Sequence, residues 1–405
     1  MNALHTTDLG VGERLEIRRR RRGLSRKVVA NLAGRSEEWL RLVESGRRKL
    51  DSIEVLLRLA EILHIDDLTE LIDTAPAPLP REANHDGILR RLRRTIVDHP
   101  ALRIYDTTGT VGTAQPAALD QGLQSCQDCW NAAPQRYSQL ARTLPGVLQA
   151  CRAAQWQARD DASASLLIQA YHLARQLLSA CGDHAMAATA ADRAMTTATE
   201  LGDTTLIAAS AWQVGHALLG LSYPTHCKNY AQAAADQLSV GVPDSTCHAA
   251  LWGALHLLSA HAAAHGSGDT ARMLDAARAA AAALDTDTQC HGIAFGPTEV
   301  GLTSIEIALI TNDPDEAIRL AATVEPSTDY LPARRTKYHI VQASAYIRRR
   351  DDIAAALALT KASRVCAEDI HYDPDARRSV RHLIRRDNYL VRPEVRHLAE
   401  LAGLP

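Results

Sequence analysis

Apolar residues recur at three- and four-residue steps along most of the chain, which is the period of an amphipathic helix. The first such stretch contains two short helical segments joined by a turn around Gly34. Ser25 and Ser36 stand where each can cap the segment that follows, and a glycine favours the left-handed end of a helix. The spacing predicts a helix-turn-helix. Its predicted inner stripes are Val28, Val29 and Leu32 in the first segment and Trp39, Leu40 and Val43 in the second.

Beyond Ala117 the same period continues as pairs of helices at an interval of about forty residues. Small residues such as Ala187 and Ala191 stand where the two helices of a pair would cross. Repeated pairs of this kind predict an α-solenoid of the tetratricopeptide kind. The predicted pairs are 163–181 with 184–201, 204–221 with 225–240, 245–265 with 269–284, 297–311 with 314–324, and 332–349 with 352–368.

A proline-rich segment between these two patterns predicts the domain boundaries. Residues 74–82, TAPAPLPRE, contain three prolines and read as a stiffened linker. We therefore expect an N-terminal domain at 1–73, a linker at 74–84 and a helical-repeat domain at 85–405. The predicted fold class is all-α without any sheet, with a mobile orientation between the two domains. A short basic helix at 86–97 and a loop at 106–116 precede the repeats.

Composition supports helices and restricts the partners. Apolar residues make up 46% of the 405 positions, with a single Phe, and the formal net charge is −2. Alanine-rich composition favours helices that pack through small side chains. Residues 1–50 contain thirteen Lys and Arg against six Asp and Glu, a local charge of +7. Positive charge is thus local, and without a long apolar run or a signal peptide we expect a cytoplasmic protein with no membrane partner.

The first stretch resembles the Xre/Cro-type DNA-binding domain, a five-helix fold, over residues 10–72. Most of its junctions match the pattern of that family. The matching positions are Leu24-Ser25, Ala33-Gly34, Ser36, Leu40, Val43-Glu44, Gly46 and Leu56-Arg58-Leu59-Ala60.

The resemblance implies that residues 36–42 enter the major groove of double-stranded DNA. Arg26 stands where the family usually has Gln, and its charge can contact phosphate instead. Glu37 and Glu38 stand at positions that usually read bases, where a carboxylate can accept from cytosine N4 or can simply complement the helix dipole. Arg41 and Glu38 are the predicted base readers. The full predicted DNA-binding set is Arg26, Lys27, Arg35, Ser36, Glu37, Glu38, Arg41, Arg47, Arg48 and Lys49.

The whole chain resembles, more loosely, the large helical regulators of Gram-positive bacteria, actinomycetes among them. That resemblance implies a transcriptional regulator, homodimeric on an inverted repeat, whose solenoid senses a peptide or small-molecule signal. An alternative is an antitoxin- or adaptor-like protein whose solenoid binds a partner protein.

In tetratricopeptide-like solenoids the first helix of each pair lines the concave face, so ligand contacts should come from those helices. Trp252 and His256 are four residues apart and share one helical face. These side chains could equally fill gaps between helices. The predicted ligand-binding residues are Tyr171, Gln213, His216, Trp252, His256, Glu306 and Tyr338.

The sequence gives little support for catalysis or for binding of a cofactor or metal. We see no catalytic constellation, so we expect no enzyme, no cofactor and no metal. Cys126-x-x-Cys129 and the pair His261 and His265 have spacings that could hold zinc, but small buried hydrophobes and an exposed helix face explain them as well. Late basic clusters read as a solvated face, a second DNA contact or a dimer seam. Those clusters lie at 334–337, 348–350 and 377–396.

Overall fold

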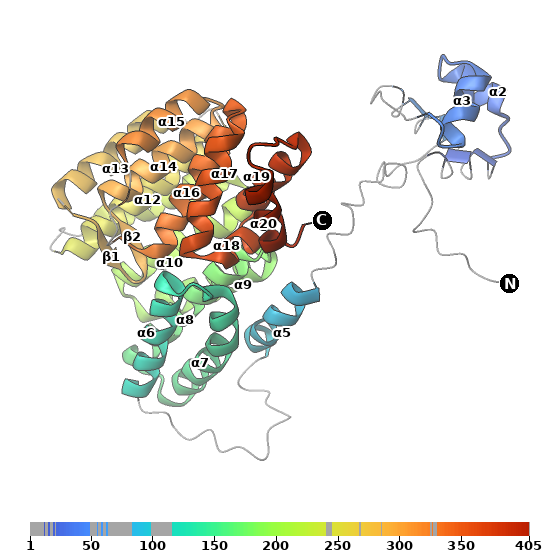
Figure 1. The fold of residues 1–405 in the computed structure, drawn as a ribbon. Helices are drawn as coiled ribbons and strands as arrows, with labels where there is room; N and C mark the ends of the chain where they lie inside the picture. Colours follow the sequence, from blue (N-terminus) through green and yellow to red (C-terminus); the bar gives the residue numbers. More distant parts are fainter. Residues whose placement is uncertain are drawn as a thin grey trace. The chain divides into compact units, whose positions relative to one another are not determined.

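The computed structural model divides into two compact units, residues 1–84 and 85–405 (Figure 1). It describes residues 22–48 and scattered helical positions between 12 and 63, and then a series of segments from residue 83 onward. The predicted linker at 74–82 and nearly all of the predicted loop at 106–116 lie outside the described residues. The later segments are 83–98, 116–239, 245–266, 269–284, 286–324, 326 and 330–404.

In the first unit, helices α2 (Arg26–Leu32) and α3 (Glu37–Glu44) pack through a small core. Val29, Leu40 and Val43 are almost fully buried in it. The predicted stripe of α2 is partly wrong, because Val28 and Leu32 are 44% and 53% exposed. A helix of two turns presents only a narrow face to its neighbours, and here Val29 and Ala30 occupy that face.

In its described residues the second unit is all-α apart from one small hairpin, which confirms the predicted fold class. Its helices form the predicted antiparallel pairs, and every first helix of a pair also contacts the first helix of the next pair. The helices are α5 (Ala83–Val97), α6 (Pro116–Ala132), α7 (Arg136–Ala158), α8 (Asp161–Ala180), α9 (His184–Leu201), α10 (Thr204–Gly220), α11 (Pro224–Ser239), α12 (Thr246–Ala264), α13 (Thr270–Leu284), α14 (Pro297–Ile310), α15 (Pro314–Thr323), α16 (Pro332–Arg349), α17 (Asp352–Val365), α18 (Ala367–Tyr372), α19 (Pro374–Arg386) and α20 (Arg392–Ala402).

Local sequence explains where these helices begin and how closely they pack. Aspartates cap several of them, as when Asp183 accepts from the backbone N–H of Met186 at the start of α9. On α9 the residues that face α8 are alanines such as Ala187 and Ala194, which are fully buried. Small side chains at these crossings allow the helices to approach closely, which is the packing that the sequence predicted.

The prediction of no sheet is wrong at one place. Strands β1 (Thr288–Cys290) and β2 (Ile293–Phe295) form an antiparallel hairpin between α13 and α14, with Cys290 opposite Ile293. Phe295, the single Phe of the chain, packs against Gly253 of α12, where a Cβ would lie 2.1 Å from its ring. Three-residue strands are too short to show an alternating pattern in the sequence, so periodicity did not reveal them.

A second correction concerns the last predicted pair. Residues 352–368 were expected to form one helix, but α17 ends at Val365 because Cys366 adopts an extended backbone, and α18 begins at Ala367. This break turns α18 toward the start of α7. Glu368 accepts from the backbone N–H groups of Tyr137 and Ser138, at 2.8 and 3.2 Å. It therefore caps α7 although it stands about 230 positions later in the sequence.

Contacts around that cap join α7, an early helix of the second unit, to α18, a late one. Asp369 accepts from Arg136 at 2.5 Å and from the Tyr137 hydroxyl at 2.7 Å. The ring of Tyr137 also stacks on that of Tyr372, with 4.5 Å between the centroids. We call these four residues the clasp. More than 230 residues separate its two halves in the sequence.

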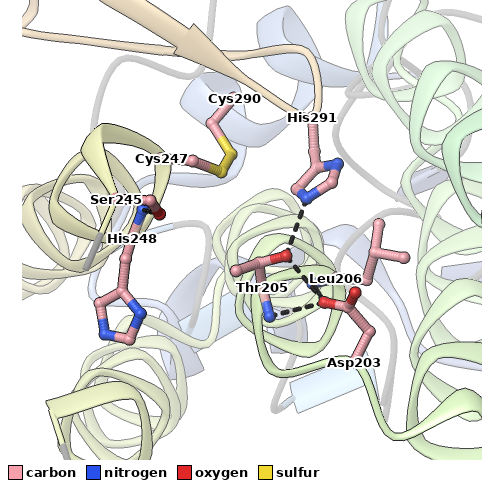
Figure 2. The surroundings of a disulfide bond; sticks show 8 residues. All are labelled: Asp203, Thr205, Leu206, Ser245, Cys247, His248, Cys290 and His291. Carbon is pink, nitrogen blue, oxygen red and sulfur yellow. Dashed lines mark hydrogen bonds between the residues drawn. A yellow bond between two sulfur atoms is a disulfide. The ribbon is translucent and has the colours of Figure 1, made fainter. Parts of the chain in front are cut away.

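The cysteines differ from the expectation in one respect. Cys247, in the first turn of α12, forms a disulfide with Cys290 at the end of β1 (Figure 2). The remaining six are free thiols, most of them buried as small apolar side chains.

In the described part of the chain, no helix is long and apolar enough to cross a membrane.

Candidate DNA-binding and ligand-binding sites

The turn between α2 and α3 is built from capping contacts. Ser25 Oγ accepts from the N–H of Val28 at 3.3 Å, and Ser36 Oγ accepts from the N–H of Trp39 at 3.1 Å. Gly34 has φ +68°, and the N–H of Arg35 reaches back to the carbonyl of Ala30 at 2.9 Å. Such a left-handed C-terminal cap stops α2 and redirects the chain into α3. The two helices therefore form a helix-turn-helix, as the capping pattern predicted.

The exposed face of α3 carries a paired acid and base. Arg41 donates to both carboxylate oxygens of Glu38, at 2.7 and 2.5 Å, and both side chains are exposed. The hydrogen bond from Arg41 lowers the pKa of Glu38. In the free protein, the two predicted base readers therefore form one neutral unit. Glu37, beside them, is exposed in the first turn of α3.

Arg26 has a structural setting that the sequence did not reveal. Its Nε donates to Glu44 at 2.6 Å and its Nη2 donates to Glu16 at 3.0 Å. Glu44 is buried and also accepts two hydrogen bonds from Arg19, at 2.6 and 3.0 Å. Burial would raise the pKa of Glu44, but these arginines lower it below its usual value. Arg26 is thus held in an ion-pair network that braces α2 against α3.

Four other predicted phosphate-binding residues are exposed and, among the described residues, form no ion pair: Lys27, Arg35, Arg47 and Arg48. Arg35 lies over the ring of Trp39, 5.7 Å from its centroid. With Ser36 and Arg48 it lines a shallow hollow beside the turn. Lys49 lies outside the described residues. This surface presents free positive charge next to α3, which is the arrangement that phosphate contacts need.

In the second unit, polar side chains form a row across the first helices of successive pairs. Arg175 on α8 donates from Nε to Gln213 on α10 at 2.6 Å. His261 on α12 lies 3.5 Å from Glu306 on α14, whose other oxygen lies 3.7 Å from Lys337 on α16. We call this set the polar row. Its members are Arg175, Gln213, His216, His261, Glu306 and Lys337.

Acids and bases compensate one another at the α14–α19 end of the row. Lys337 lies 3.6 Å from Asp373 and 3.5 Å from Asp375, in addition to Glu306. Burial alone would raise the pKa of Glu306, but the hydrogen bond with His261 and the charges of Lys337 and Arg334 lower it to about 2. Arg334 is itself paired with buried Glu299. The cations at this end are therefore already paired with carboxylates.

Solvent reaches these groups although they are strongly desolvated. The side chains of His261, Glu306 and Lys337 are 23%, 19% and 27% exposed. Desolvation is nevertheless the largest influence on the pKa of Glu306 and of Lys337, and it lowers the pKa of His216 well below its usual value, with help from Arg175. Partial exposure combined with desolvation is expected of a recessed surface, where a ligand can exchange for water.

The structure separates the predicted ligand-binding residues into three groups. Gln213, His216 and Glu306 lie in the polar row. Tyr171 and Tyr338 pack in the core, where the Tyr338 hydroxyl donates to the carbonyl of Ala321 at 2.8 Å. Trp252 and His256 do contact each other, with 4.2 Å between centroids. Burial lowers the pKa of His256, and the charges that act on it come from Asp236 on α11 and Arg272 on α13, not from members of the polar row.

Sequence reasoning missed several members of the row. Arg175 was not singled out, because one arginine in an otherwise apolar helix gives no spacing signal. His261 was considered only with His265, on which it stacks at 5.7 Å. Lys337 stood in a basic cluster that was read as a solvated face. A charged residue inside an alanine-rich first helix was the signal available for all three.

Metal-ligand geometry occurs at a different place from the two predicted spacings. Among the described residues, donor atoms of Cys247, Cys290 and His291 lie within 4.8 Å of one another. The two sulfurs form the disulfide, and His291 Nε2 is hydrogen-bonded to the hydroxyl of Thr205 at 3.0 Å (Figure 2). With both sulfurs bonded to each other, no thiolate is available as a ligand in this state.

Comparison with known proteins agrees with the geometry of the first unit. Residues 11–71 match the family described as "Helix-turn-helix domain". The chain carries a helix-turn-helix domain at its N-terminus. No curated protein matches the chain.

A solved structure of Bacillus thuringiensis PlcR in complex with the peptide PapR7 and DNA is similar to 68% of this chain and 95% of that chain. The sequence identity is 13% and the TM-score is 0.36, which is too low to support an argument about function. The helix-turn-helix domain and the polar row therefore carry the functional conclusions.

Proposed function

We propose that this protein is a sequence-specific DNA-binding transcriptional regulator. The observation that carries the proposal is the capped helix-turn-helix, whose α3 exposes Glu38 and Arg41 beside free positive charge at Lys27, Arg35 and Arg48. A helix of this kind reads base edges in the major groove, while the surrounding cations position it on phosphates. Arg26 and Ser36 serve the domain structurally, through the Glu44 network and the cap of α3.

A single domain of this size makes few base contacts, so useful affinity needs two of them. We propose a homodimer that binds an inverted repeat whose half-sites lie about one helical turn apart. The domain arrangement that goes with it is a DNA-binding domain at 1–73, a linker at 74–84 and a helical-repeat domain at 85–405. In this arrangement the second unit acts on DNA binding through the spacing of the two domains.

We further propose that the polar row is where a peptide or small-molecule signal binds. Partly exposed, desolvated charged groups on consecutive first helices support this assignment, because they offer hydrogen bonds that water satisfies poorly. Gln213, His216 and Glu306 are the residues retained from the sequence prediction. A ligand bound there stabilises the second unit by mass action and shifts the population of DNA-competent dimers.

The DNA-binding proposal is tested by incubating purified full-length protein with fragmented DNA of the source organism and sequencing the retained fragments. We expect enrichment of an inverted repeat. Retention of fragments in proportion to their abundance would contradict sequence-specific binding. Arg48→Ala protein is the matched control, because it should retain less DNA of every sequence.

The ligand proposal is tested by thermal-shift assays of the same protein against fractionated extracts of that organism. A fraction that stabilises the wild type should lose its effect on Glu306→Gln protein. An equal response of the variant would show that the ligand does not bind at the polar row. A protein that co-purifies stoichiometrically would instead favour the adaptor-like alternative.

A further inference from the structure

The guanidinium of Arg175 is buried without a counter-ion. The residue is 5% exposed in the middle of α8. Its Nε and Nη2 both donate to a single neutral acceptor, Oε1 of Gln213, and its guanidinium lies over the ring of Trp212 at 5.5 Å. Among the residues that the structure describes, no carboxylate pairs with Arg175. A buried charge is normally paired because desolvation is costly.

Three other recessed cations of the second unit are paired with carboxylates. Arg136 is paired with Asp369, Arg334 with Glu299, and Lys337 with three carboxylates. Burial lowers the pKa of Arg175 to about 9, and no acidic group raises it. A guanidinium with that pKa still carries its charge at neutral pH, so the positive charge persists without compensation.

Two buried polar atoms near Arg175 have no hydrogen-bond partner among the described residues. Because Gln213 turns its carbonyl oxygen to the guanidinium, its Nε2 is buried without a hydrogen-bond partner. His172, one turn earlier on α8, bonds Ser210 through Nε2 at 2.9 Å and leaves Nδ1 without a partner. The amide donor of Gln213, without an acceptor and beside an uncompensated cation, matches the oxygens of an anion.

The surroundings also direct an anion to this place. His172, one turn from Arg175, lines a small polar pocket with Gln169, Gln176 and His291, although Arg175 and Gln213 do not themselves line it. At the opposite end of the polar row, Lys337 and Arg334 are already paired with carboxylates, so neither offers an uncompensated charge to an anion. An anionic group that approaches the row is therefore favoured at its α8–α10 end.

We propose that Arg175, assisted by the amide of Gln213, binds an anionic oxygen group of the ligand, either a carboxylate or a phosphate. The proposal rests on the proposed binding of a signal along the polar row, and it names the chemistry that one end of that signal must have. In the ligand-free protein, burial of Arg175 without a counter-ion lowers the stability of the fold. A bound anion removes that cost and gains affinity from its removal.

The test uses the full-length protein and two probes, sodium acetate and inorganic phosphate, each against sodium chloride at equal ionic strength and pH 7. Phosphate also stabilises proteins by exclusion from their surface, so the readout is the difference in Tm shift between variants. We expect at least one anion to raise the Tm of the wild type by about 1–3 °C more than that of Arg175→Met protein. A response to acetate alone identifies a carboxylate, and a response to phosphate alone identifies a phosphate group.

Gln213→Glu is the decisive matched variant, because it supplies the absent carboxylate at nearly constant shape. We expect it to raise the Tm without any added anion and to abolish the response to both probes. A lower Tm for Gln213→Glu, or an equal anion response of wild type and Arg175→Met, overturns the proposal. These measurements do not involve DNA or extracts, so they can fail while the proposed regulator function stands.

Discussion

Arg136 and Arg175 are both buried arginines of the same helical unit, yet their surroundings differ in kind. Arg136 lies in the clasp, where Asp369 accepts from it and the rings of Trp130 and Tyr137 cover it at 4.7 and 5.2 Å. Arg175 lies in the polar row, where its partners among the described residues are the amide of Gln213 and the ring of Trp212. Burial alone therefore does not show what role a charged residue has. The presence or absence of a counter-ion distinguishes the two arginines.

The largest expected effect is on the clasp. Arg136→Met would leave Asp369 buried without its cation, and breaking a buried ion pair from one side costs about 3–5 kcal/mol. We expect the free energy of unfolding to fall by that amount in urea denaturation followed by tryptophan fluorescence. An unchanged midpoint would show that the contacts between α7 and α18 do not stabilise the second unit.

The same distinction between paired and free arginines applies on the DNA-binding face. Arg41→Ala should weaken binding to the preferred site by about 1–3 kcal/mol and relax specificity at one base pair. Glu38→Ala should instead strengthen binding to random DNA, because it removes a carboxylate that repels phosphate and frees Arg41. Fluorescence anisotropy on the preferred site and on a random duplex measures both effects. If Arg41→Ala weakens the two duplexes equally, Arg41 does not read a base.

Histidine burial beside Arg175 makes stability depend on pH. Burial, and secondarily the charge of Arg175, lower the pKa of His172 to about 3, whereas an unfolded chain has a histidine pKa of about 6.5. The unfolded state therefore binds more protons below about pH 6.5, and stability falls by about 1.4 kcal/mol per pH unit as pH drops toward 3. His172→Gln should reduce the measured slope by that amount and leave the contribution of His216, as urea denaturation between pH 6.5 and 4.5 would show. Exposed His226 on α11 supplies the control substitution, and equal slopes for wild type and His172→Gln would refute the assignment.

The smallest effect is expected at a free arginine on the protein surface. Arg48→Ala should weaken binding to all DNA sequences alike and reduce the slope of log K against log salt concentration by about one. Titration of one duplex at several salt concentrations measures this slope. Arg26→Ala provides the contrast, because the Glu44 network predicts lower stability of the helix-turn-helix domain before any loss of phosphate contact. A reduced salt slope for Arg26→Ala without loss of stability would restore Arg26 as a phosphate ligand.

Local features of the structure could be predicted from the sequence, and long-range pairings could not. The helix-turn-helix and the repeated pairs follow from apolar period, capping serines and aspartates, and glycine at helix ends, all of which act within a few residues. The clasp joins Arg136 to Asp369 across 233 positions, and no local pattern reports such a contact. The same holds for the disulfide between Cys247 and Cys290, which depends on where a short hairpin folds back.

The candidate sites show the same limit. Glu38 and Arg41 were identified because they stand at fixed offsets from the cap of α3. Tyr171 and Tyr338 were selected because they are aromatic and near mid-helix, but helical position does not decide whether a side chain faces a core or a recess. Arg175 needed three neighbouring helices to be placed before its lack of a counter-ion became visible.

The most direct test of the account compares Arg136→Met and Arg175→Met with the wild type in the same urea titration at pH 7, without added anions other than chloride. Both substitutions remove a buried guanidinium and leave an unbranched apolar side chain. We predict a loss of about 3–5 kcal/mol for Arg136→Met and a far smaller change for Arg175→Met, because removing an uncompensated charge offsets the loss of the hydrogen-bond partner of Gln213. A comparable loss of stability in both variants would contradict the claim that Arg175 marks an unfilled anion site.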